Sequence, residues 1–123
     1  MTIAEAINRV DEIQPNTISY NTKVAWLSQL DGELWANVCC HYMDNEHPVC
    51  PKYDEITDGD TVLVVGHPFE ELYVYFLQAK IFYAYEEYAK FNTAMAMHER
   101  DRASWRNHYN NTHTAVEVKL RFW

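Results

Sequence analysis

Residues 68–88 have the sequence PFEELYVYFLQAKIFYAYEEY, which predicts a long helix at the centre of the fold. Pro68 suits the first turn of a helix, because an amide in that turn has no helical partner and is not needed. Glu70 and Glu71 follow in the same turn, where the positive end of the helix dipole favours acidic side chains. The apolar residues then cover two adjoining sides of the helix. An apolar arc this wide predicts burial inside the domain or beneath a second molecule.

Two helices are predicted upstream of this stretch. In the first, Thr2 and Glu5 have the spacing of a capping box, and an apolar stripe continues until Pro15 ends the helix. The second begins near residues 19–21. It continues through Gly32, because its apolar stripe keeps its phase there and one interior glycine costs only about 1 kcal/mol. This stripe leaves Lys23 outside and comprises Val24, Leu27, Leu30, Leu34, Trp35 and Val38.

A last helix is predicted downstream of the central one. Asn92 or Thr93 is a suitable cap for its first turn, and the pair Asn110-Asn111 is expected to end it. Together these patterns predict a mainly α fold, a bundle of about four helices.

Two other segments carry the pattern of short strands and add a small β element to this prediction. Residues 61–65 are a β-branched run that follows a turn, and residues 115–122 alternate between apolar and other side chains. A lone strand cannot satisfy its backbone, so the terminal one must pair either with residues 61–65 or with another subunit. We therefore predict a helical domain over residues 1–113 and a C-terminal arm over residues 114–123. The arm residues expected to form a subunit interface are Val116, Val118, Leu120 and Phe122.

The composition fits one globular domain, with 123 residues of which 48% are hydrophobic. Aromatic residues make up 15%, which suits either a core built on rings or a surface that meets partners. The formal charge of −8 argues against affinity for DNA, although it is compatible with a surface past which DNA slides. Neither a signal peptide nor a membrane-spanning segment is predicted.

One cluster of residues could carry chemistry, at Cys39-Cys40-His41 with His47 and Cys50. Thiolates and imidazoles are zinc ligands, so Cys40, His47 and Cys50 are weak candidates for a metal site. Their spacing matches no common zinc motif, and free thiols are the expected state of all three cysteines. The adjacent carboxylates Glu70-Glu71 and Glu86-Glu87 are interpreted as solvated helical positions. Because no nucleophile with a positioned base, acid–base constellation or glycine-rich phosphate loop is recognisable, we expect no enzymatic activity and no cofactor.

Five stretches of the chain carry a resemblance to a known family. They are TIAEAINRVDEIQPNT at residues 2–17, KVAWLSQLDG at 23–32, PFEELY at 68–73, YAKFNT at 88–93 and YNNTH at 109–113. Together they resemble the head–tail connector (adaptor) proteins of tailed bacteriophages, in particular the small neck proteins of siphophages and prophages of Firmicutes. The likeness covers residues 1–113 and is loosest between residues 41 and 60.

The resemblance implies a structural subunit of the virion neck that assembles in the bacterial cytoplasm. Such subunits form a ring, typically a dodecamer, beneath the portal protein. The ring extends the channel through which DNA passes without specific binding, and it docks the stopper or tail-completion protein. No catalytic residue, cofactor or membrane contact is implied. The sequence leaves two alternatives open. One is a small helical adaptor or regulatory protein of a bacterial host that binds a protein partner, and the other is an enzyme or metal protein built on the Cys/His cluster.

Overall fold

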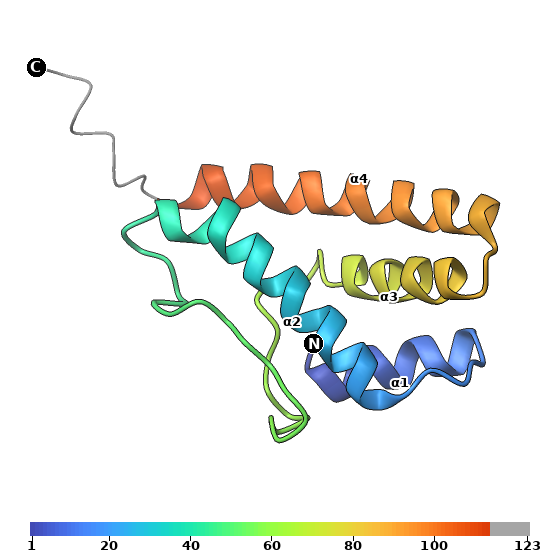
Figure 1. Ribbon diagram of the computed structural model, residues 1–123. Coiled ribbons are helices and arrows are strands. Elements are labelled where there is room, and N and C mark those ends of the chain that lie inside the picture. Colours follow the sequence, from blue (N-terminus) through green and yellow to red (C-terminus); the bar gives the residue numbers. More distant parts are fainter. Residues whose placement is uncertain (114–123) are drawn as a thin grey trace, which may run out of the picture.

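The computed structural model describes residues 1–113, and these are mainly helical, as predicted. The elements are α1 (Ile3–Ile13), α2 (Tyr20–Asn37), the 3-10 helix η1 (Cys39–His41), α3 (Glu71–Ala84) and α4 (Tyr88–Thr112). Figure 1 shows α3 and α4 lying antiparallel and side by side, while α1 and α2 also pack against α3. A long segment without regular structure joins η1 to α3.

The first two helices begin where the sequence predicts. Thr2 caps α1 by accepting a hydrogen bond from the amide of Glu5 at 3.2 Å, and Ser19 caps α2 by accepting one from the amide of Thr22 at 3.1 Å. Because α2 is continuous through Gly32, the predicted uninterrupted helix is confirmed. The apolar stripe of α1 is completely buried and comprises Ile3, Ala6, Ile7 and Val10.

Lys23 occupies the buried side of α2, so its predicted position outside the stripe is wrong. Its side chain is 2% exposed, and its ammonium group donates to Oδ1 of Asp11 at 2.5 Å. Asp11 lies near the end of α1, so the pair joins the first two helices. A buried ammonium group is tolerable because this carboxylate balances its charge.

Helix α3 is central, as its wide apolar arc predicts, but it is shorter than residues 68–88. It begins at Glu71, after a turn that contains Pro68, and it ends at Ala84. Glu86 then adopts a φ of 61°, and the chain reverses into α4, which begins at Tyr88, ahead of the predicted caps. A positive φ is unfavourable for a residue with a side chain. Packing of α4 along α3 offsets this cost. No sequence pattern predicts the helix break at Glu86.

The predicted strand at residues 61–65 is not a strand. Its only ladder contact among the described residues is an isolated antiparallel bridge between Thr2 and Val62. On either side of that bridge, Ile3 donates to the carbonyl of Thr61, and Leu63 donates to the carbonyl of Met1, both at 3.0 Å. The segment is therefore fastened to the start of α1. The predicted C-terminal strand, residues 115–122, lies outside the described residues.

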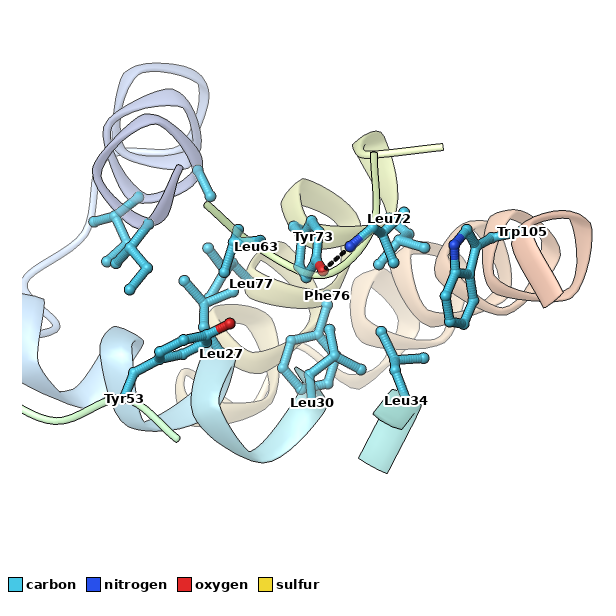
Figure 2. Packing of buried hydrophobic residues seen from close by; sticks show 14 of the residues in the cluster. Leu27, Leu30, Leu34, Tyr53, Leu63, Leu72, Tyr73, Phe76, Leu77 and Trp105 are labelled. Carbon is cyan, nitrogen blue, oxygen red and sulfur yellow. Dashed lines mark hydrogen bonds between the residues drawn. The ribbon is translucent and has the colours of Figure 1, made fainter. Parts of the chain in front are cut away.

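The hydrophobic core lies where α1, α2, α3 and α4 meet the segment before α3. Figure 2 shows Leu27, Leu30 and Leu34 of α2 facing the buried side of α3, with Trp105 of α4 at one end. Leu63 and Tyr53 reach the same cluster from the irregular segment. This segment thus contributes to the core although it has no regular secondary structure.

Candidate functional site

Asp31 is a carboxylate buried in the middle of α2. Its Oδ1 accepts from the hydroxyl of Tyr73 at 2.6 Å, while its Oδ2 accepts from the hydroxyl of Tyr53 at 2.6 Å and from the amide of Val64 at 3.1 Å. The Tyr73 hydroxyl in turn accepts from the amide of Val65 at 2.8 Å, the bond dashed in Figure 2. We call these five residues the Asp31 network.

The titratable groups of the Asp31 network lie inside the protein, and burial changes their pKa values. Burial raises the pKa of Asp31 above its ordinary value of 3.8, although the hydrogen bonds from Tyr53, Tyr73 and Val64 lower it. Burial and the neighbouring carboxyl group also raise the pKa of both tyrosines, so their hydroxyls keep their protons and donate. With its carboxylate fully buried, the network presents no surface to a substrate. Its role is to hold the segment before α3 against α2 and α3.

The cysteine and histidine residues considered as metal ligands do not form a metal site in the part of the chain that the structure describes. No group of three or more His, Cys, Asp or Glu side chains in residues 1–113 is arranged to hold a metal ion. Cys40 donates to the carbonyl of Ala36 at 3.1 Å, and Cys50 is exposed. The carbonyl of His47 accepts from the indole of Trp35 at 2.6 Å, which fastens the loop to α2. Cys39 is buried, and burial raises the pKa of its thiol to about 11.

His98 is the other buried titratable side chain of interest. Its Nδ1 lies 2.8 Å from the carbonyl oxygen of Leu72, which can only accept, so Nδ1 carries the proton. Burial lowers the pKa of His98, which favours this neutral form. Nε2 has no hydrogen-bond partner within residues 1–113. The ring centroids of His98 and Phe76 lie 5.2 Å apart. His98 therefore joins α4 to α3 and is a core residue.

Exposed aromatic side chains gather where α3 turns into α4. Tyr83 is 58% exposed and Tyr88 53% exposed, and their ring centroids lie 5.6 Å apart. The ring centroid of Phe91 lies 5.3 Å from that of Tyr83. Tyr85, also exposed, accepts from the amide of Thr17 at 2.8 Å, which places the α1–α2 connection at the same end of the bundle. We call Tyr83, Tyr85, Tyr88 and Phe91 the aromatic end.

A groove of about 420 Å³ adjoins the aromatic end and runs between α3 and α4. Its walls are mostly apolar, and Lys90 at its edge lies 5.8 Å from the ring centroid of Phe82. The apolar lining residues are Tyr75, Phe82, Ala89, Ala94 and Met97, and the polar ones are Gln78, Lys90 and Thr93. Exposed apolar surface of this kind, bordered by polar groups, is typical of sites where proteins meet. The aromatic end and the α3–α4 groove together form the candidate functional site.

The comparisons with known proteins identify no relative. No protein-family model matches the chain, and neither a curated protein nor a solved structure does. Within the described residues, no helix is long and apolar enough to cross a membrane.

The sequence prediction and the structure point to different surfaces. The predicted interface residues Val116, Val118, Leu120 and Phe122 lie outside the described residues. The sequence did not reveal the aromatic end, because its three tyrosines lie within the predicted central helix and their exposure depends on where α3 ends. Asp31 could have been singled out by its position four residues after Leu27, on the buried stripe of α2.

Proposed function

We propose that this protein is a head–tail connector subunit of a tailed bacteriophage, a structural protein that forms a ring beneath the portal. In this role it extends the DNA channel and docks the stopper or tail-completion protein. The observation that carries the proposal is the exposed apolar surface at one end of the helical domain, made of the aromatic end and the α3–α4 groove. The resemblance of residues 1–113 to connector proteins specifies which assembly this surface would serve.

The charge of the chain supports the same role. A formal charge of −8 gives a surface that repels phosphate, and a channel for DNA must let the duplex slide without holding it. Tyrosine and tryptophan supply apolar contact area with a hydrogen-bonding tip, which suits docking between proteins. The Asp31 network fixes the irregular segment before α3 to α2 and α3, so the domain meets its partners as a rigid body.

The proposal is tested by removing the gene from a phage that encodes it and supplying variants in trans. We expect DNA-filled heads without tails when the protein is absent, and restoration by the wild type. The double variant Tyr83→Ala/Tyr88→Ala is expected to restore few complete virions, because it removes exposed aromatic contacts. Ile56→Ala is the control, since Ile56 is an even more exposed apolar side chain and lies on the loop before α3.

Electron microscopy of complete particles provides the second measurement. A ring of this protein directly beneath the portal is the expected result. Complete, infectious virions that lack the protein would overturn the proposal. A discrete complex with a host protein, formed without any phage component, would favour the host adaptor instead.

A further inference from the structure

We propose that the α3–α4 groove binds the C-terminal segment, residues 114–123, of a second copy of this chain. This inference deepens the proposed function, because it names the contact that would join neighbours in the ring. The groove is apolar and open, and several of its lining residues, such as Ala89 and Thr93, are exposed in the single chain. It therefore needs an occupant with a narrow apolar face.

The C-terminal segment has such a face. Its sequence, TAVEVKLRFW, places apolar side chains at alternate positions. In an extended conformation these side chains would all point to one side and the charged ones to the other. One face could then enter the groove, while the charged face stays in water. The inward-facing residues are Val116, Val118, Leu120 and Phe122.

Strand pairing with residues 61–65, the alternative that the sequence leaves open, is disfavoured by the described contacts. Thr61 donates its amide to the carbonyl of Asp58, Leu63 to that of Met1, and Val64 and Val65 donate to the Asp31 network. A new strand needs free donors on alternate residues of the edge it joins. Four of its five amides are thus bonded within the domain, which leaves no pair of alternate donors, so a side-chain groove is the better receptor.

The length of the C-terminal segment distinguishes binding to the groove of the same chain from binding to the groove of a second copy. Helix α4 ends at Thr112, and at about 1.5 Å per residue Met97 lies about 22 Å back along it and Ala89 about 34 Å. Ten residues extend to about 33–36 Å at most. A segment folded back on its own helix would bring only its last residues to the groove. A segment from a neighbour can place all four apolar residues in it.

Charge complementarity favours the same arrangement. Residues 1–113 have a formal charge of −9, because seventeen of the eighteen acidic residues and eight of the ten basic ones lie there. In the C-terminal segment, Lys119 and Arg121 outnumber Glu117. The acidic pair Glu86-Glu87 stands at the turn that closes the groove, and Lys90 partly balances it at 3.3 Å from Glu87. A basic segment thus approaches an acidic domain.

Such a contact is heterologous, since the donating and receiving surfaces differ. After one contact forms, the donating copy keeps a free groove and the receiving copy keeps a free segment, so repetition closes a ring or extends a filament. This is the geometry that a connector requires, and a symmetric dimer does not provide it.

Complementation between two full-length variants tests the inference. Ala89→Arg fills the groove from an exposed helical position, and Leu120→Asp/Phe122→Asp spoils the apolar face of the segment. We expect each variant alone to self-associate at least about tenfold more weakly than the wild type in sedimentation velocity, the effect of losing an anchor side chain. An equimolar mixture should form a 1:1 heterodimer and nothing larger, because only one intact groove and one intact segment remain.

Controls separate this result from loss of folding or a general charge effect. Ser104→Arg adds the same charge to an exposed position of α4 away from the groove and should associate like the wild type. Far-ultraviolet circular dichroism should show every variant to be folded. A wild type that stays monomeric at its solubility limit would overturn the inference, and so would folded variants whose mixture stays monomeric. Either result leaves the proposed function standing, because the location of the protein in the virion is measured independently.

Discussion

Replacing Asp31 should reveal how strongly its network holds the fold together. In Asp31→Leu, two tyrosine hydroxyls and the amide of Val64 lose their acceptor inside the protein. Each buried donor left without an acceptor costs about 1–3 kcal/mol. Small domains are stable by only about 5–15 kcal/mol, so the variant should lose a large part of its free energy of unfolding.

The triple variant Asp31→Leu/Tyr53→Phe/Tyr73→Phe is the matched control. It removes the two hydroxyl donors together with their acceptor and keeps the size of the rings. The amide of Val64 still lacks its acceptor, and the amide of Val65 loses the Tyr73 hydroxyl, so two donors stay unsatisfied instead of three. Because each buried unsatisfied donor is destabilising, the triple variant should recover about a third of the loss. Urea unfolding followed by circular dichroism measures both differences. A loss below about 1 kcal/mol in Asp31→Leu, or a triple variant no more stable than the single one, would refute this account.

The same network gives stability a dependence on pH. Because burial raises the pKa of Asp31 in the folded state, the folded chain still holds this proton after the unfolded chain has released it near pH 3.8. Stability therefore falls as the pH rises from 3.8 to the raised folded-state pKa. The difference in free energy of unfolding between the wild type and Asp31→Asn should be most favourable to the wild type below pH 3.8. This advantage of the wild type should decrease as the pH rises from 3.8 to the raised pKa of Asp31 in the folded state. Taking the difference cancels the other titrating groups.

Three further outcomes are expected. Gly32→Ala should raise the free energy of unfolding by about 0.4–1 kcal/mol in thermal scans, because its new Cβ would meet only Sγ of Cys50 and the carbonyl oxygen of Pro51 at 3.9 Å. A thiol reagent at neutral pH should modify the exposed Cys50 and leave Cys39 unreacted until the chain unfolds, because the Cys39 thiol has a pKa of about 11; mass spectrometry of the labelled peptides measures this. The isolated protein should bind duplex DNA weakly even at low salt, and submicromolar, salt-dependent binding in fluorescence anisotropy would contradict the DNA-channel role.

The parts of the fold that sequence reasoning predicts are those specified locally. Thr2 and the apolar stripe after it lie within a few residues of each other, so capping and periodicity locate α1. The burial of Lys23 depends instead on Asp11, one helix earlier. The break at Glu86 depends on the packing of α4 against α3, because tyrosine, alanine and glutamate would all continue a helix.

Residues 61–65 show the same limit in another form. The β-branched run is typical of a strand, but its amides bond to Met1 and Asp31, which are distant in sequence, and to the side chain of Tyr73. Each of these partners is a single group, and together they fix an irregular path that no periodic pattern encodes. The candidate site was likewise beyond sequence reasoning, since its exposure follows from where two helices end.

The fastening of α1 to residues 59–63 also has a consequence for synthesis on the ribosome. Ile3 and Ala4 donate to the carbonyls of Thr61 and Gly59, and the terminal amine of Met1 lies 3.0 Å from a carboxylate oxygen of Glu70. Helix α1 therefore lacks these partners until about 60 further residues have been translated, roughly 3–12 s at elongation rates of about 5–20 residues per second. Until then its apolar stripe stays uncovered in the nascent chain. A chain released before Glu70 is made would leave this helix open to chaperones and proteases.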